Sequence, residues 1–196
     1  MYVSMQSKCE RHSGFFIHLH QNGGISMYQF YVNNELYQVE GDGKLLPFLR
    51  DVCKCKSVKD GCSEGACGAC TVIIDGKTCK ACVPDTDSLD GREIITVEGL
   101  TEWEQQVYTY AYGKAGAVQC GFCIPGMVMC TKALLDENME PTDDEIRYAL
   151  RNNYCRCTGY VKIMDAVRLA AKILKAGEIP DDGAPNWTLG NRVARI

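Results

Sequence analysis

Eight of the thirteen cysteines fall into two groups whose spacing suits metal ligands. The first group lies in the run CSEGACGAC and ends with a single cysteine after a short strand and turn; its members are Cys62, Cys67, Cys70 and Cys82. The arrangement C-x4-C-x2-C…C is typical of a plant-type 2Fe-2S cluster. Cys79 is a second candidate for the fourth ligand, and we favour Cys82 because it lies beyond the turn on the returning strand. Spacing alone leaves both open.

Glycines in the first cysteine run support an iron-sulfur cluster. A cluster bound by four thiolates carries negative charge, so its loop must present backbone N–H groups to the sulfur atoms. Gly65 and Gly68 permit the positive φ angles that turn successive amides in this way. Zinc is the alternative for any group of four cysteines, but zinc sites usually combine two C-x-x-C units, whereas here one loop supplies three ligands.

The second group consists of Cys120 and Cys123 in CGFC and, far along the chain, Cys155 and Cys157 in CRC. Pro125 suits the start of a helix, whose positive dipole end would face the site, and Arg156 adds a cation. Both features favour a bound anion. We predict a second iron-sulfur site here, although this spacing is less diagnostic and leaves zinc open.

Composition limits the remaining possibilities. The 196 residues suffice for one large or two small domains, and the net charge of -4 gives no reason to expect nucleic acid or an anionic membrane as partner. The odd number of cysteines and the absence of a signal-like start argue against a secreted disulfide scaffold and favour a reducing cytoplasm. No segment approaches the roughly twenty apolar residues of a membrane span.

The order of patterns predicts an α+β protein with two domains. Residues 1–26 show no sustained period and are expected to form an unstructured arm, in which His12, His18 and His20 are scattered rather than a metal tract. Residues 27–101 predict a ferredoxin-like (β-grasp) domain: a hairpin at 28–39, a helix at 45–52, a buried strand at 71–74 and a closing strand at 94–97.

Helical patterns dominate residues 102–176 and predict an all-α domain of four helices. Trp103, Val107 and Tyr110 are expected on one face of the first helix. Thr142 and Glu145 form a capping box at the start of the third helix. The apolar stripe of the fourth helix consists of Ile163, Val167, Ala170, Ala171 and Leu174. Residues 177–196 lack a period and are expected to be a linker or docking tail.

Three runs carry a family resemblance: SVKDGCSEGACGACTVIIDGK, GAVQCGFCIPGMVM and NNYCRCTGYVKI. Together they resemble the iron-sulfur subunit or domain of the molybdenum hydroxylases, the xanthine dehydrogenase family, over residues 27 to about 176. The resemblance implies two 2Fe-2S clusters that carry electrons from a molybdopterin centre, which hydroxylates xanthine or a related heteroaromatic compound, usually to flavin. It therefore implies a molybdopterin-binding partner and an FAD-binding partner.

Residue roles follow from the same resemblance. It implies that Cys120, Cys123, Cys155 and Cys157 hold the cluster near molybdenum and that Cys62, Cys67, Cys70 and Cys82 hold the distal one. Gln119 matches a glutamine that hydrogen-bonds the pterin, and Cys157 matches the ligand at which electrons enter. The motifs are most similar to those of selenium-dependent xanthine dehydrogenases, in which this domain precedes a fused molybdenum domain; the ending TLGNRVARI resembles the start of that domain.

The other side chains offer no catalytic group, so we expect no substrate chemistry from this chain alone. Cys9, Cys53, Cys55, Cys79 and Cys130 lie outside both groups and are interpreted mainly as small buried apolar residues. Two alternative functions remain at this stage. The chain could be a free carrier with two clusters that serves an unrelated reductase, or an interaction module stabilised by zinc.

Overall fold

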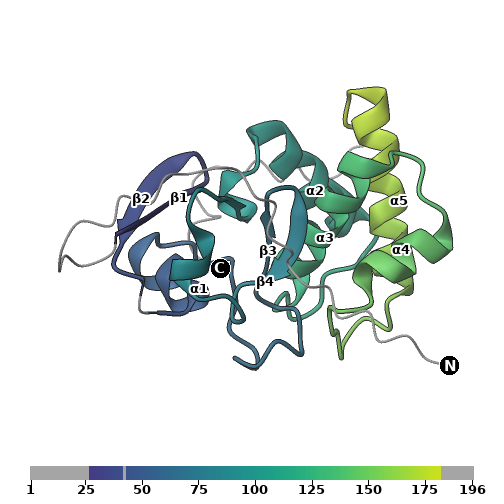
Figure 1. The fold of residues 1–196 in the computed structure, drawn as a ribbon. Coiled ribbons are helices and arrows are strands. Elements are labelled where there is room, and N and C mark those ends of the chain that lie inside the picture. Colours follow the sequence, from purple (N-terminus) through teal and green to yellow (C-terminus); the bar gives the residue numbers. More distant parts are fainter. Residues whose placement is uncertain (1–26, 42, 182–196) are drawn as a thin grey trace, which may run out of the picture.

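The computed structural model describes residues 27–41 and 43–181 and has a ferredoxin-like part, built on a sheet, beside a helical part. Figure 1 shows the sheet and helix α1 on one side of the molecule and helices α2 to α5 on the other. The five strands run in the spatial order β2-β1-β5-β3-β4. This arrangement confirms the predicted fold class.

The first hairpin forms as the sequence predicts. Strands β1 (Tyr28–Val32) and β2 (Glu35–Val39) pair antiparallel, with Val32 opposite Glu35. Asn33 and Asn34 make the turn with φ angles of 51° and 69°, in the left-handed region that asparagine tolerates better than most residues. Phe30 and Val32 alternate with exposed residues and point into the core of the sheet.

The predicted helix at 45–52 forms in two short pieces, α1 (Leu45–Pro47) and a π-helical turn (Phe48–Val52). Pro47 belongs to the first turn, where its missing N–H leaves no intrahelical hydrogen bond unmade. Leu45, Leu46 and Leu49 are buried against the sheet. The side chain of Val52, the last residue of the π-helical turn, is exposed.

The rest of the sheet frames the first cysteine loop. Strands β3 (Thr71–Ile74) and β4 (Lys77–Lys80) form an antiparallel hairpin around Asp75 and Gly76, and β5 (Glu93–Ile95) pairs antiparallel with β3 and parallel with β1. A short 3-10 turn, Thr86–Leu89, precedes β5.

The closing strand was expected to reach Val97, and this boundary is wrong. The Thr96 amide donates to Asn33 Oδ1 at 2.9 Å instead of extending the strand, and a 3-10 turn follows at Val97–Gly99. An asparagine side chain therefore takes the place of the next strand partner.

Four helices form the second part: α2 (Glu102–Lys114), α3 (Ile124–Glu137), α4 (Asp143–Leu150) and α5 (Val161–Ala176). The capping box at α4 is present as predicted, and Thr101 with Glu104 makes a second one at α2. Gly177, with φ of 74°, ends α5 in the left-handed conformation that glycine adopts without steric cost.

The expected face of α2 is wrong in part. Val107 is buried, but Trp103 is 36% exposed and Tyr110 is only partly buried. The buried residues are Val107, Tyr108, Ala111 and Tyr112, whose face turns toward α5. The Tyr112 hydroxyl lies 2.8 Å from Thr131 Oγ1 of α3, so this helix buries a polar atom that has a partner.

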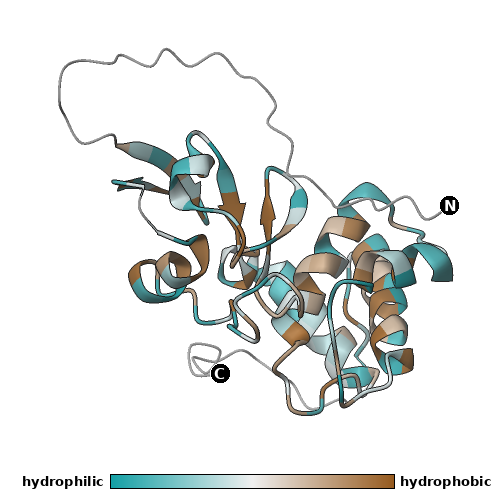
Figure 2. Ribbon diagram, turned by 60° about the horizontal axis from the view of Figure 1, so that its bottom comes forward, coloured by the Kyte–Doolittle hydropathy of each residue, from teal (hydrophilic) through white to brown (hydrophobic). Residues whose placement is uncertain are grey.

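Each part has its own apolar core, and β3 contacts both. Val72 and Ile74 face the core of the sheet, whereas Ile73 packs with the helical core that includes Val107, Met127 and the buried face of α5. Figure 2 shows apolar residues both on the strands and along the helices. Because β3 is buried on both sides, the helical part covers one face of the sheet.

Among the described residues, no helix combines the length and apolar character needed to cross a lipid bilayer. The proposed N-terminal arm, its histidines, Cys9 and the ending TLGNRVARI lie outside the described residues.

The capping box of α4 makes a testable contribution to local stability. Glu145 N–H donates to Thr142 Oγ1 at 3.3 Å, and the Glu145 carboxylate accepts the Thr142 amide at 2.7 Å. Thr142→Ala removes the capping oxygen, which costs about 1 kcal/mol, so amides of α4 should exchange with solvent about fivefold faster. Thr142→Ser keeps the cap and serves as control in hydrogen-exchange mass spectrometry. Equal exchange in both variants would contradict this role.

Candidate metal centres

The hairpin β3–β4 brings two cysteines of the first group together. Cys70 immediately precedes β3 and Cys82 lies two residues past the end of β4, so the pairing of Thr71 with Lys80 places both at the same end of the hairpin. Their sulfur atoms are 3.5 Å apart, and both side chains are buried. Cys79 lies on β4 itself, opposite Val72. The expected place of Cys82 on the returning strand is thus slightly wrong, since β4 ends before it.

The cysteine loop directs its amides at sulfur atoms. The Gly65 N–H donates to Cys82 Sγ at 3.2 Å, and the Cys67 N–H donates to Cys62 Sγ at 3.4 Å. Gly65 and Gly68 have φ angles of 77° and 74°, as predicted from the need to turn the amides inward. Amides of Cys67 and Glu64 lower the pKa of the Cys62 thiol to about 7. The loop therefore favours negative charge on this sulfur.

The second group gathers between helix ends. Cys123 is the N-cap of α3, with Pro125 in the first turn, and Cys155 and Cys157 lie between α4 and α5. The sulfur atoms of Cys120 and Cys157 are 3.7 Å apart. The thiols of Cys123 and Cys155 lie near enough for each to perturb the pKa of the other. Arg156 is exposed, and no contact of its cation with the site is seen among the described residues.

The surroundings of Cys123 and Cys155 shift the pKa values of their thiols in opposite directions. Burial raises the pKa of Cys123 to about 12. Burial also acts against ionisation of Cys155, but its pKa is lowered because the Thr158 hydroxyl and the amides of Cys157 and Thr158 donate to its sulfur. The Thr158 Oγ1 to Cys155 Sγ distance is 3.1 Å. Tyr160 accepts the Cys155 amide at 2.8 Å through its hydroxyl and thereby holds the CRC loop.

In each group one pair of sulfur atoms lies close together, Cys70 with Cys82 and Cys120 with Cys157, and two thiolates per metal ion suit two irons better than one zinc. A 2Fe-2S cluster takes two thiolates on each iron. Tetrahedral zinc with Zn–S bonds of about 2.3 Å needs all four sulfurs within about 3.8 Å of one another. In the part of the chain that the structure describes, no three His, Cys, Asp or Glu side chains are grouped around one ion position. The donor sets therefore fit 2Fe-2S clusters.

The two cysteine loops touch each other directly. The Tyr154 N–H, next to Cys155, donates to the Cys67 carbonyl at 2.9 Å. The buried Asn153 amide donates to the Gly68 carbonyl at 3.0 Å and accepts the thiol of Cys130 at 3.1 Å. Residues 153 and 154 of the helical part thus bind residues 67 and 68 of the ferredoxin-like part.

Sequence reasoning missed Asn153 as a functional residue. Its side chain is 2% exposed, and an asparagine two residues before Cys155 gives no sign of a partner 85 positions away. Glycine at Gly68 is part of the same contact: a Cβ there would lie 2.2 Å from the Asn152 carbonyl oxygen. A Cβ at Gly126, in the first turn of α3, would lie 2.4 Å from the Gly68 oxygen.

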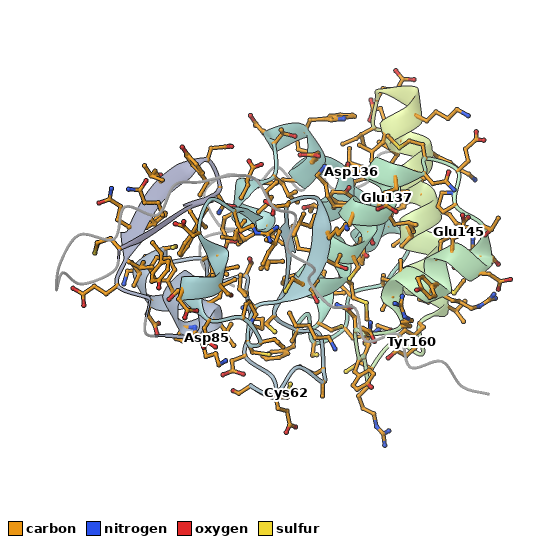
Figure 3. All side chains as sticks on the ribbon, viewed as in Figure 1. Cys62, Asp85, Asp136, Glu137, Glu145 and Tyr160 are labelled. Carbon is orange, nitrogen blue, oxygen red and sulfur yellow. The ribbon has the colours of Figure 1, made fainter. Side chains whose placement is uncertain are left out.

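Exposure differs between the two groups. Cys120 and Cys157 are exposed, as is Gln119 beside them, whereas Cys70 and Cys82 are buried in the sheet part. Figure 3 shows Cys62 and Tyr160, one from each loop region, along the same edge of the molecule. The other described cysteines differ: Cys55 and Cys130 are buried as expected, while Cys53 and Cys79 are only partly buried.

Comparisons with known proteins agree with this architecture. The family described as 2Fe-2S iron-sulfur cluster binding domain matches residues 34–107, and the 2Fe-2S binding domain family matches residues 96–168. The nicotinate dehydrogenase small FeS subunit of Eubacterium barkeri is 48% identical over 134 residues, which cover 68% of this chain and 85% of that subunit.

A second relative is the xanthine dehydrogenase iron-sulfur-binding subunit of Escherichia coli O157:H7, 46% identical over 114 residues that cover 57% of this chain and 72% of the subunit. Among solved structures, quinoline 2-oxidoreductase from Pseudomonas putida 86 aligns with a TM-score of 0.70 and 34% identity, covering 79% of this chain and 98% of the matched chain.

The chain belongs to the family of 2Fe-2S iron-sulfur subunits of molybdenum hydroxylases. Its function is electron transfer within a molybdenum-containing oxidoreductase, with two 2Fe-2S clusters as its own cofactors and molybdopterin as the cofactor of the catalytic part. Both alternatives, the free two-cluster carrier for an unrelated reductase and the interaction module stabilised by zinc, are thereby set aside.

The contact at Gly68 can be tested against a glycine of the same conformation. Gly68→Ala adds a Cβ that collides with the Asn152 carbonyl, whereas Gly76→Ala, at φ of 78°, meets no atom within 4 Å. Both variants carry the left-handed cost of about 1–2 kcal/mol. On heating, Gly68→Ala should lose the visible absorbance of the clusters at a clearly lower temperature than Gly76→Ala. Thermal bleaching measures this temperature. Equal bleaching temperatures would show that the two loops do not depend on this close approach.

Proposed function

We propose that Cys62, Cys67, Cys70 and Cys82 bind one 2Fe-2S cluster and that Cys120, Cys123, Cys155 and Cys157 bind the other. The supporting observation is the association of sulfurs in pairs, 70 with 82 and 120 with 157, together with N–H groups directed at Cys62 and Cys82. When bound, the clusters supply one-electron redox chemistry, while the chain supplies position, hydrogen bonds and shielding from water.

Electrons enter at the exposed end of this arrangement. Cys157 and Cys120 are the exposed ligands, so a partner can approach them without opening the fold. Gln119 is exposed next to Cys120 and, by the resemblance of its motif, hydrogen-bonds the pterin. On the inner side, Cys155 and Cys67 are joined through the Tyr154 N–H and the Cys67 carbonyl, one hydrogen bond of 2.9 Å. This contact supports the order of transfer from the helical part to the ferredoxin-like part.

Five further assignments belong to this proposal: domain bounds, partners, location, substrate and branch of the family. The domains span 27–101 and 102–176, in accord with two separate apolar cores. The partners are a molybdopterin-binding subunit or domain and an FAD-binding one, in the cytoplasm. The substrate is xanthine or a related N-heteroaromatic compound, supported by the names of similar subunits. Membership of the selenium-dependent branch, in which this domain is fused to a molybdenum domain, is supported by the similarity of the motif sequences alone.

The choice of Cys82 over Cys79 as fourth ligand is testable. Cys82 lies 3.5 Å from Cys70 and receives the Gly65 amide, whereas Cys79 donates weakly to the Lys80 carbonyl at 3.9 Å. Cys82→Ser should abolish the EPR signal of the plant-type cluster and remove about two irons per chain. Cys79→Ser should retain both signals and all the iron. The reverse result would overturn the ligand assignment.

Electron entry is tested by Gln119→Leu in the enzyme assembled with its molybdopterin partner. Loss of one hydrogen bond of about 0.5–1.5 kcal/mol should slow reduction of the clusters by substrate roughly threefold to tenfold. Reduction by dithionite and the iron content should stay unchanged. Gln106→Leu, an exposed glutamine on α2, is the matched control. Substrate reduction as fast as in the wild type would contradict the placement of the pterin at Gln119.

A further inference from the structure

Lys80 places a cation inside the first cysteine loop. It is the last residue of β4, two positions before Cys82, and its side chain is half-buried. Its Nζ donates to the Gly65 carbonyl at 2.6 Å and to the Ala66 carbonyl at 3.1 Å. One ammonium group therefore holds two successive carbonyls of the loop that carries Cys62 and Cys67.

These carbonyls belong to the same peptide groups whose N–H ends face Cys62. The Gly65 carbonyl shares its peptide with the Ala66 N–H, and the Ala66 carbonyl shares its peptide with the Cys67 N–H. The Cys67 N–H lies 3.4 Å from Cys62 Sγ, and the Ala66 N–H also donates to this sulfur. Lys80 thus fixes both peptides from their oxygen ends, which keeps both N–H groups directed at one sulfur.

The same contact has an electrostatic consequence. A 2Fe-2S cluster with four thiolates is negative and gains a further negative charge on reduction. A nearby cation and hydrogen bonds to the sulfurs stabilise the reduced form more than the oxidised form. Acidic residues on this loop favour the oxidised form instead. Asp60 accepts the Ser63 amide at 3.1 Å, and Glu64, two residues after Cys62, is exposed.

We propose that Lys80 is a positioning residue that raises the reduction potential of the cluster held by Cys62, Cys67, Cys70 and Cys82. This inference rests on the proposed ligand set. A higher potential makes the distal cluster a better electron acceptor and so favours transfer away from the molybdopterin side. In the described residues Lys80 does not contact the cysteine loops of the helical part. The reduction potential of the cluster held there should therefore be independent of Lys80.

The test is a potentiometric EPR titration of the full chain. Lys80→Met keeps the length of the side chain and removes its charge, and Lys80→Arg keeps the charge. Lys77→Met removes a charge from the exposed start of the same strand and is the matched control. In Lys80→Met the ratio of reduced to oxidised distal cluster at a fixed potential should fall about tenfold, a midpoint shift of about 59 mV for one electron. Lys80→Arg and Lys77→Met should remain close to the wild type.

The remaining outcomes of the titration also decide the question. A fully loaded Lys80→Met chain with an unchanged midpoint, or an equal shift in Lys77→Met, overturns the role of Lys80 and leaves the ligand set intact. If Lys80→Met loses the distal cluster, Lys80→Gln replaces it, since its amide still donates one neutral hydrogen bond; a lowered midpoint supports the proposal and a wild-type midpoint overturns it. A wild-type chain without two cluster signals overturns both the ligand set and this inference.

Discussion

The contact between the two cysteine loops is the constraint on which the rest of the structure depends. Tyr154 donates to the Cys67 carbonyl, and buried Asn153 donates to the Gly68 carbonyl, so each loop completes the hydrogen bonding of the other. Leaving a buried polar group without a partner costs more free energy than its hydrogen bond contributes. Separating the two loops would therefore destabilise the fold. Folding the helices onto β3 therefore sets the relation of the two metal centres as well as the core.

The two groups of cysteines differ in how far some of their side chains are exposed to solvent. Cys120 and Cys157 are exposed, whereas Cys70 and Cys82 are buried at one end of the β3–β4 hairpin, and the two cysteine loops are joined by hydrogen bonds. An electron carrier needs one end open to its donor and its clusters shielded from water, because low polarity strengthens the hydrogen bonds that tune them. The fold supplies the two conditions with different elements: helix ends for the open site and a strand hairpin for the closed one.

Local signals in the sequence predicted much of this. The hairpin at 28–39, the Thr142–Glu145 capping box and the glycines of the cysteine loop each depend on residues close together in the sequence, and all have the expected structures. Errors arose where a distant residue intervened. Asn33 ends the last strand by binding Thr96, and contact with α5 rotates the buried face of α2 away from Trp103. Asn153, Gly126 and Lys80 could not be recognised because their partners lie in other segments.

EPR spectroscopy of the anaerobically purified chain after reduction with dithionite, with iron and acid-labile sulfide counted on the same sample, tests the central claim most directly. Two distinct rhombic signals and about four irons and four sulfides per chain are predicted, because each group of four cysteines is proposed to hold one 2Fe-2S cluster. A colourless chain that contains zinc, or a single signal with about two irons, would contradict the account.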